Sequence, residues 1–240
     1  MQVGFVTDQG GSRKANEDSF LVDQGLGLFI VADGLGGHNE GKLASRIATE
    51  EIAQYVKENF YLENDLISVV EQAVFRANTS IARAAEADPE WRSDMGSTVV
   101  VALLKDNRFV VANVGDSRAY LIRKENIEQL SEDHTFVAEW VKSGTITKEE
   151  ARTHEARRGL WMALGVEDEI EPHVTQGAWN GDSCLLLCSD GLTDVIEDKE
   201  ILRLTIESKD PQEACDRLLL RAKELGTSDH VTALLLCGTC

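Results

Sequence analysis

The order of apolar segments along the chain is the feature that most restricts its fold. Short runs typical of strands come first, and two long segments with helical periodicity follow. Further strands, two more helical segments and one last strand complete the chain. A regular alternation of strand and helix would predict a parallel sheet, but this order lacks it. We therefore expect an α+β fold, a layered sandwich of antiparallel sheets with helices outside.

The individual segments follow from periodicity and from turn residues. An apolar stripe that includes Leu43, Ile47 and Ile52 predicts a first helix within residues 42–60, and a similar stripe predicts a second at about 65–87. Strands are expected at residues 3–7, 19–22, 28–32, 97–104, 108–113, 119–123, 174–178, 183–188 and 231–237, and two more helices at 199–208 and 211–225. Residues 135–163 have a helical pattern that is polar and broken by glycine, so we expect them at the periphery.

Length and charge restrict the class of protein. The three prolines form no linker, so residues 1–240 are expected to be one domain with a substantial core. The 24 basic and 42 acidic residues give a net charge of −18, which opposes binding to nucleic acids and to anionic membranes. No apolar run approaches the ~20 residues that span a bilayer. Most carboxylates are expected to solvate the surface, although the acidic balance also suits divalent cations.

The N-terminus and the cysteines indicate the compartment. Residues 1–8 lack the basic and apolar regions of a secretory signal, and the number of cysteines, five, is odd. We therefore expect a reducing cytoplasm, with the three cysteines in apolar stretches as small core residues. Cys237 and Cys240 have C-x-x-C spacing. Because no second pair of ligands accompanies them, a chance pair at the terminus is favoured over a zinc site.

Acidic residues recur where predicted strands begin or end. Five such ends carry them: Glu17-Asp18, Asp33-Gly34, Asp116, Asp190-Gly191 and Asp229. One Asp-Gly pair is an ordinary turn, but five ends in two stacked sheets can converge on one cleft, where like charges need a cation. Carboxylates favour Mg²⁺ or Mn²⁺ over zinc, and Gly34 can offer its carbonyl because it lacks a Cβ. Two such ions about 4 Å apart can activate water for in-line attack on phosphorus.

Arg13 lies a few residues before Glu17 and Asp18. A guanidinium group binds a phosphoryl group through two parallel hydrogen bonds, which a lysine cannot match. Arg13 is therefore a candidate phosphate ligand, and an ordinary surface arginine is the alternative.

Several longer motifs stand in the order known from one protein family. They are TDQG (7–10), RKANED (13–18), VADGLGGH (31–38), GST (96–98), ANVGDSRAY (112–120), DH (133–134), ALG (163–165), LCSDGLTD (187–194) and SDHVT (228–232). Over essentially its whole length, the chain resembles the bacterial branch of the metal-dependent serine/threonine protein phosphatases of type 2C.

The resemblance implies a four-layer αββα sandwich of two antiparallel sheets and paired helices, with a binuclear Mn²⁺ or Mg²⁺ centre. It implies that Asp33 bridges both metals and that Asp190 and Asp229 complete the first. The Gly34 carbonyl, with Glu17 and Asp18 partly through water, would hold the second metal. Asp116 with Asp190 would offer a weaker third site. Arg13 would bind the substrate phosphate, and residues 143–158 would form a mobile flap that helps to select the protein substrate.

Two positions depart from the family pattern. The last motif usually reads Asp-Asn, and His230 replaces the asparagine, so metal affinity is the property in question. His230 could support the turn or itself bind a metal. Eukaryotic members have a histidine just after Asp-Gly, proposed as a general acid, where this chain has Leu35. His38 is the nearby candidate for proton transfer, and a hydrogen-bonded turn residue is the alternative.

The expected function is hydrolysis of phosphoserine and phosphothreonine in proteins by metal-activated water, with Asp33, Asp190 and His38 as catalytic residues. The chain contains no Cys-x₅-Arg loop that would indicate a cysteine nucleophile. A regulator that binds phosphoproteins without hydrolysing them is the alternative, but such proteins usually lose the metal carboxylates, which this chain keeps. A two-metal nuclease is opposed by the acidic charge. Expected partners are phosphoprotein substrates and a cognate Ser/Thr kinase, and we expect a monomer that binds no nucleic acid or membrane.

Overall fold

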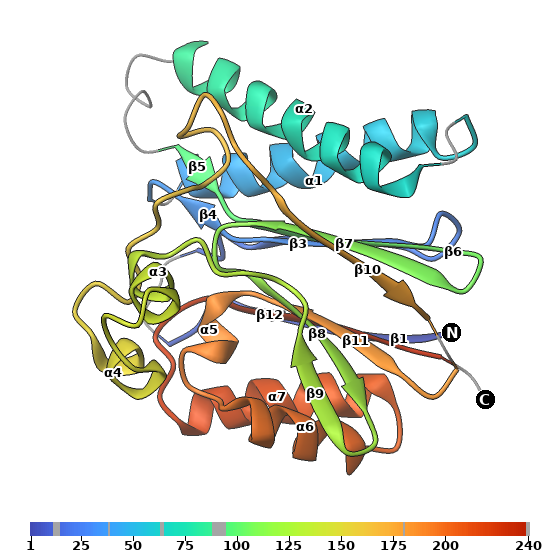
Figure 1. The fold of residues 1–240 in the computed structure, drawn as a ribbon, viewed down its shortest axis with the longest axis vertical. Helices are drawn as coiled ribbons and strands as arrows, with labels where there is room; N and C mark the ends of the chain where they lie inside the picture. Colours follow the sequence, from blue (N-terminus) through green and yellow to red (C-terminus); the bar gives the residue numbers. More distant parts are fainter. Residues whose placement is uncertain (12–14, 38, 63–64, 88–94, 180, 239–240) are drawn as a thin grey trace.

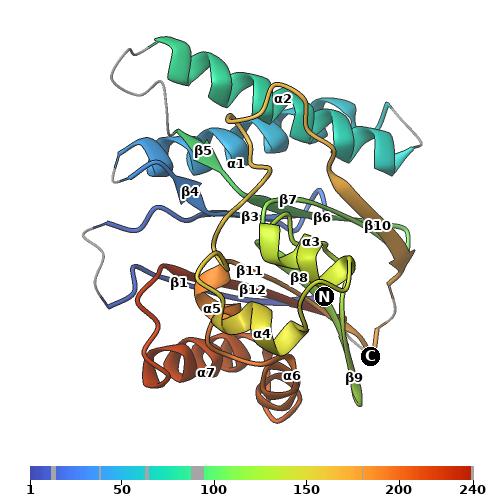
Figure 2. The same cartoon turned by 60° about the vertical axis from the view of Figure 1, so that its left-hand side comes forward.

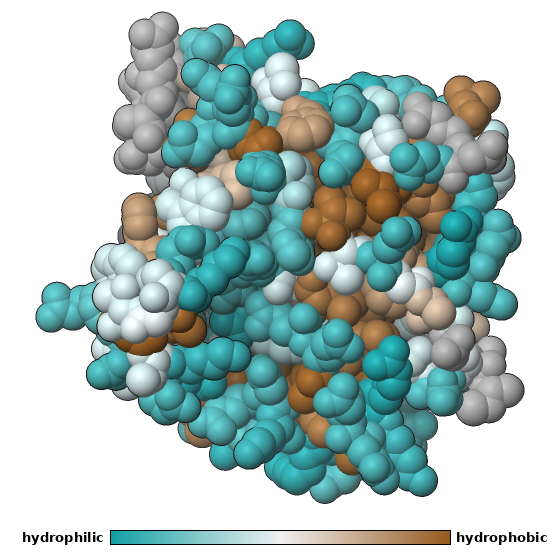
Figure 3. Space-filling view, in the orientation of Figure 1, coloured by the Kyte–Doolittle hydropathy of each residue, from teal (hydrophilic) through white to brown (hydrophobic). Residues whose placement is uncertain are grey.

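Two five-stranded antiparallel sheets lie face to face in the computed structural model, and a pair of helices covers the outer face of each (Figure 1). The structure describes residues 1–240 except 12–14, 38, 63–64, 88–94, 180 and 239–240. The layers follow the order helices, sheet, sheet, helices, which confirms the α+β sandwich predicted from the sequence. Hydrophilic side chains cover most of the face shown in Figure 3, in keeping with the net charge of −18.

The last strand of the chain pairs with the first strand, and the two are antiparallel. The first sheet has the order β1 (Gln2–Asp8), β12 (Val231–Cys237), β11 (Cys184–Cys188), β8 (Arg118–Arg123) and β9 (Asn126–Gln129). The second sheet has the order β10 (His173–Ala178), β7 (Arg108–Val114), β6 (Val99–Lys105), β3 (Leu28–Ala32) and β2 (Ser19–Asp23). The short strands β4 (Gly34–Leu35) and β5 (Gly96–Ser97) form a separate antiparallel pair. Along the chain, β4 comes directly after β3 and β5 directly before β6.

The helices in the described ranges form two covering pairs and three short helices. The pair α1 (Glu40–Asn59) and α2 (Leu66–Ala87) covers the second sheet, and the pair α6 (Asp198–Ile206) and α7 (Pro211–Glu224) covers the first. The short helices are α3 (Phe136–Lys142), α4 (Lys148–Thr153) and α5 (Asp190–Thr193). Figure 2 shows α3 and α4 outside the four layers. None of the helices in the described ranges is long and apolar enough to cross a bilayer.

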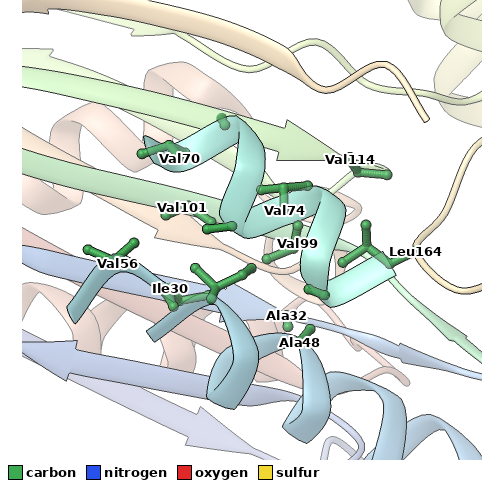
Figure 4. Packing of buried hydrophobic residues seen from close by; sticks show 14 of the residues in the cluster. Ile30, Ala32, Ala48, Val56, Val70, Val74, Val99, Val101, Val114 and Leu164 are labelled. Atoms are coloured by element: carbon green, nitrogen blue, oxygen red, sulfur yellow. The ribbon is translucent and has the colours of Figure 1, made fainter. Parts of the chain in front are cut away.

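The central strands are buried on both faces, which explains their uninterrupted apolar sequences. In β3, Leu28, Ile30 and Ala32 pack toward α1 and α2, whereas Phe29 and Val31 point into the space between the sheets. Figure 4 shows the helix-facing layer, in which Ile30 and Ala32 lie against Val99, Val101 and Ala48. Burying one such Leu or Ile side chain stabilises the fold by roughly 1.5–3 kcal/mol. Residues that end these strands therefore stand on a rigid support.

Three segments differ from the expectation. Residues 135–163 are helical only in α3 and α4, because Gly144 (φ 75°) ends the first and the extended residue His154 ends the second. The strand β9 was not predicted, since its sequence Asn-Ile-Glu-Gln is mostly polar and its residues are mostly exposed. The four-residue helix α5 directly follows β11 and is too short to produce a periodic pattern.

The cysteines are a further correction. Cys184 on β11 lies directly opposite Cys237 on β12, and the two form a disulfide. Cys188 and Cys215 are buried free thiols, as expected of small core residues. The sequence does not indicate the pair, because 53 residues separate its members and only the strand register brings them together.

Candidate functional site

The acidic residues at the strand ends lie together at one edge of the sandwich. Antiparallel pairing produces this arrangement, because Ser19 at the start of β2 lies opposite Ala32 at the end of β3, and Arg118 at the start of β8 lies opposite Cys188 at the end of β11. One pocket at this edge is lined by six of the predicted metal ligands, namely Glu17, Asp33, Gly34, Asp116, Asp190 and Asp229. The structure thus brings together residues that the sequence places more than 200 positions apart.

Asp18, the seventh predicted ligand, is buried and is held from two other strand ends. Its Oδ2 accepts hydrogen bonds from Ser189 Oγ (2.9 Å) and from Thr232 Oγ1 (2.6 Å). Its Oδ1 is buried and has no hydrogen-bond partner among the described residues, and the same holds for Asp190 Oδ1. A buried carboxylate oxygen without a donor is costly. These two oxygens therefore have the environment expected of groups that face a cation.

The pKa values of the carboxyl groups show the same need for positive charge. Burial raises the pKa of Asp33 well above its ordinary value, and the nearby carboxylates of Asp18, Asp190 and Asp116 raise it further. Burial and neighbouring acidic groups also raise the pKa of Asp190 well above its ordinary value, and burial raises the pKa of Asp116 to about 7. Divalent cations in this pocket would stabilise the ionised carboxylates, because an opposite charge favours the charged form.

The backbone of Asp33 is clamped by the segment that begins β6. Its N–H donates to Thr98 Oγ1 (3.1 Å), and its carbonyl oxygen accepts from the Thr98 N–H (2.8 Å) and from Ser97 Oγ (2.9 Å). Thr98 Oγ1 also shares a hydrogen bond of 2.7 Å with Ser117 Oγ, next to Asp116. The two predicted ligands Asp33 and Asp116 are therefore linked through one buried hydroxyl pair.

Two glycines allow the close approach of backbone segments around the pocket. A Cβ on Gly34 would lie 2.0 Å from the carbonyl oxygen of Gly41, near the start of α1. A Cβ on Gly191 would lie 1.8 Å from the carbonyl oxygen of His230. Both obstacles are backbone atoms that cannot move without shifting a strand or a helix. Only glycine fits at these positions, next to Asp33 and Asp190.

Arg158 enters the pocket from the segment 143–158, and sequence reasoning gave it no role. Its Nε and Nη2 donate to Asp194 Oδ2 (2.9 and 2.8 Å), and its Nη1 lies 3.0 Å from Asp229 Oδ2. The contact joins the end of this segment to the acidic edge. No local pattern indicates it, because Arg158 is one of several basic residues in a polar stretch and its partners lie at least 36 residues away.

His230 is buried, and its ring joins the last strand to the first loop. Its Nε2 lies 2.7 Å from the carbonyl oxygen of Ala15, so Nε2 carries the proton and donates. One of its ring nitrogens also lies within 4.8 Å of carboxylate oxygens of Asp18 and Asp33. This position is compatible with the predicted support of the turn and with the predicted metal ligation, and both stay predictions.

Two predicted residues lie outside the part of the chain that the structure describes. They are Arg13, the candidate phosphate ligand, and His38, the candidate proton donor. Their neighbours Ala15 and Gly37 are described, and Gly37 lines the acidic pocket.

The donor set of the pocket consists of carboxylates and backbone carbonyls, with His230 as the one nitrogen donor among the described lining residues. Such oxygen-rich sites suit Mg²⁺ and Mn²⁺. The two buried oxygens without partners and the tight fit at Gly34 add to this match. The residues present therefore fit a centre of divalent cations.

Comparison with known proteins gives consistent results. A family model described as protein phosphatase 2C matches residues 11–224. The serine/threonine phosphatase stp of Listeria innocua is 34% identical over 241 residues, which cover 98% of this chain and 95% of that protein. The crystal structure of serine/threonine phosphatase Stp1 from Staphylococcus aureus superposes with a TM-score of 0.88 at 35% identity, covering 98% of this chain and 94% of that one. The catalytic domain of serine/threonine protein phosphatase PstP, solved with two manganese ions, superposes with a TM-score of 0.86 at 33% identity, covering 98% and 96%.

Proposed function

The chain belongs to the protein phosphatase 2C family, and we propose that it hydrolyses phosphoserine and phosphothreonine in proteins at a centre of two divalent cations, Mn²⁺ or Mg²⁺. The observation that carries the proposal is the pocket itself, in which buried carboxylates from five strand ends converge and two of their oxygens lack a partner among the described residues. The manganese ions in the PstP structure support the choice of cation.

The proposed assignment of cation ligands follows the family resemblance, and it is supported by the pocket that six of these residues line. Asp33 would contact both ions, since it is surrounded by Asp18, Asp190 and Asp116. Asp190 and Asp229 would complete the ligands of one ion. Glu17, Asp18 and the Gly34 carbonyl would hold the other ion. Asp116 with Asp190 would offer a weaker third site. When bound, divalent cations lower the pKa of water to near neutrality and offset the negative charge of the phosphoryl group.

The remaining steps belong to side chains of this chain. Thr98, Ser189 and Thr232 fix the orientation of Asp33 and Asp18 through the hydrogen bonds described above. We propose that Arg13 binds two oxygens of the phosphoryl group and that His38 gives a proton to the departing serine or threonine oxygen. Exclusion of a cysteine nucleophile is supported by the burial of Cys188 and Cys215, the two free thiols among the described residues, because burial raises the pKa of each to about 12.

The alternative of a phosphoprotein-binding regulator without activity is not favoured by any of these observations, because all the predicted metal carboxylates are present. We further propose that residues 1–240 form a single catalytic domain with residues 143–158 as its flap, and that the protein is a cytoplasmic monomer that opposes a cognate Ser/Thr kinase. In that compartment Cys184 and Cys237 would be held as two thiols.

The direct test measures hydrolysis of an aryl phosphate and of a phosphothreonine peptide with Mn²⁺, with Mg²⁺ and with excess chelator. We expect activity only with metal. Asp33→Asn and Asp190→Asn should each lower kcat/KM by about a thousandfold or more, since metal ions supply several kcal/mol of transition-state stabilisation. Asp168→Asn, which removes an exposed carboxylate, is the matched control and should be unaffected. Full activity in excess chelator would contradict the proposal.

A further inference from the structure

A groove lies between the flap (residues 143–158) with α3 on one side and the core on the other. It encloses about 460 Å³ and shares Asp116 and Asp190 with the acidic pocket, so it opens directly onto the proposed reaction centre. We call it the flap groove. A protein segment that places a phosphorylated residue in the pocket has this groove as a continuous path for the residues beside it.

The flap wall of the groove is positively charged. Lys148, Arg152 and Arg157 line it, whereas the flap carboxylates Glu149, Glu150 and Glu155 do not. The reason is local in one case, because Glu150 folds back onto Thr147 to close the capping box of α4. The segment therefore separates its charges, with basic side chains toward the groove.

These three basic groups have no ion-pair partner within 4.0 Å among the described residues. Three carboxylates of the opposite wall, in contrast, already have ion-pair partners, and the fourth, Asp198, accepts a hydrogen bond from the Tyr120 hydroxyl (3.2 Å). Asp133 binds Arg118 through two oxygens, Glu132 binds Lys142, and Asp194 binds Arg158. Outside the metal ligands, the groove-lining side chains without an ion pair are thus three basic groups and one carboxylate, Asp198, so their summed charge is positive on a chain whose net charge is −18.

We propose that the flap groove binds an acidic peptide segment of the substrate, in which aspartate or glutamate residues flank the phosphorylated residue. The inference rests on the proposed phosphatase function and adds its substrate preference. Charge complementarity carries it, because carboxylates of the substrate would meet Lys148, Arg152 and Arg157 while most of the protein surface repels them. Val137, Ala138 and Val141 of α3 add a short apolar strip that accepts the stems of these side chains.

The test compares phosphothreonine peptides that differ only in three flanking residues, which are glutamate, glutamine or lysine, placed on either side of the phosphothreonine. Glutamine matches glutamate in shape and lacks its charge. With Mn²⁺ and low salt, we expect glutamates placed on one side of the phosphothreonine to raise kcat/KM about five- to tenfold over glutamines at the same positions. This is the effect expected of two or three exposed ion pairs. The difference should lie in KM, since the same contacts hold substrate and transition state. It should shrink as salt shortens the screening length.

The variant Lys148→Ala/Arg152→Ala/Arg157→Ala should bring the ratio of glutamate to glutamine peptide close to one. Its matched control, Lys57→Ala/Arg83→Ala/Lys124→Ala, removes the same number of exposed positive charges away from the groove and should keep the wild-type ratio. Equal kcat/KM for glutamate and glutamine peptides in the wild type at low salt overturns the inference, as does an undiminished ratio in the groove variant. Hydrolysis of an aryl phosphate, measured in parallel, reports the metal centre. Its absence would refute the proposed function, whereas its presence without a preference for glutamate refutes only the groove.

Discussion

Gly34 shows how much of this site depends on single atoms. It follows Asp33, lines the acidic pocket and leaves no space for a side chain, because an added Cβ would lie 2.0 Å from a backbone oxygen of Gly41. Glycine is thus required at this position for two reasons. It allows α1 to pack tightly against β4, and it leaves the carbonyl accessible for its proposed role in metal binding.

Gly34→Ala is therefore expected to lower the free energy of unfolding by about 1–3 kcal/mol or more, since the backbone of α1 must shift. It should also weaken Mn²⁺ binding, measured by titration calorimetry. Gly25→Ala is the control, because the nearest atom to its Cβ is a side-chain oxygen of Asp23 at 3.3 Å. If both variants have the same stability and metal affinity as the wild type, the close packing at Gly34 has no functional consequence.

At this scale, the sequence allowed part of the site to be predicted. Asp33 and Asp190 could be predicted because each ends a long apolar run and is followed by glycine. This pattern can be recognised in the sequence without knowledge of the fold. Arg158 could not be found, because its role depends on Asp194 and Asp229, which reach it only through the tertiary structure. The partners of Asp18, Ser189 and Thr232, were missed for the same reason.

At the scale of elements, the segment between β9 and α3 is fastened by one buried histidine. His134 Nδ1 accepts a hydrogen bond from the Gly115 N–H (3.1 Å), and its backbone bonds to Gly115 and to Trp161 on either side. Burial lowers the pKa of His134 to about 4. The imidazole is therefore neutral in the folded protein at every pH above that value, and it joins the turn before Asp116 to the region that follows the flap.

This pKa predicts a pH dependence of stability. Between about pH 6.5 and pH 4 the unfolded chain binds a proton at His134 that the folded protein does not, so the contribution of this residue to stability is lost as pH falls through that window. The loss should reach at most about 1.4 kcal/mol per pH unit. His134→Asn should flatten the dependence, measured by urea unfolding at several pH values in chelator. His173→Asn, at a half-exposed position, is the control. Parallel curves for wild type and His134→Asn would contradict this assignment.

Long periodic elements were predictable and short ones were not. The predicted helices at 42–60 and about 65–87 correspond to α1 and α2 within two residues at each end, since each buries a continuous stripe against the second sheet. In the flap, α4 has no buried residue, so its polar sequence contains no pattern that could place its ends. Its start is instead marked by the capping box of Thr147 and Glu150.

At the scale of the whole molecule, the fold gathers its most costly charges at one edge. The strands that carry Asp33, Asp116, Asp190 and Asp229 are anchored in a core that is buried on both faces of each sheet, so the carboxylates cannot move apart to relieve repulsion. The convergence was predictable from the number of acidic strand ends. Which carboxylate oxygens have a hydrogen-bond partner could not be predicted, because that depends on how the two sheets pack against each other.

This arrangement couples metal binding to global stability. Because divalent cations would bind the folded edge and not the unfolded chain, Mn²⁺ at about 100 times its dissociation constant should stabilise the protein by about 2.7 kcal/mol for each ion bound. For a chain of this length that corresponds to a rise in Tm of roughly 5–11 °C relative to protein in chelator. Calorimetry with and without Mn²⁺ measures the shift.

Asp33→Asn separates this coupling from ordinary packing. In chelator the variant should melt above the wild type, because it removes one of several like charges that share a buried pocket without a cation. With Mn²⁺ it should melt below the wild type, because a proposed ligand of both ions is lost. Asp168→Asn, at an exposed position, should follow the wild type in both conditions. The reversal of order between the two conditions is the decisive result. If Asp33→Asn is less stable than the wild type in chelator as well, the carboxylate supports the fold directly, and the acidic edge is not held in a strained state that metal relieves.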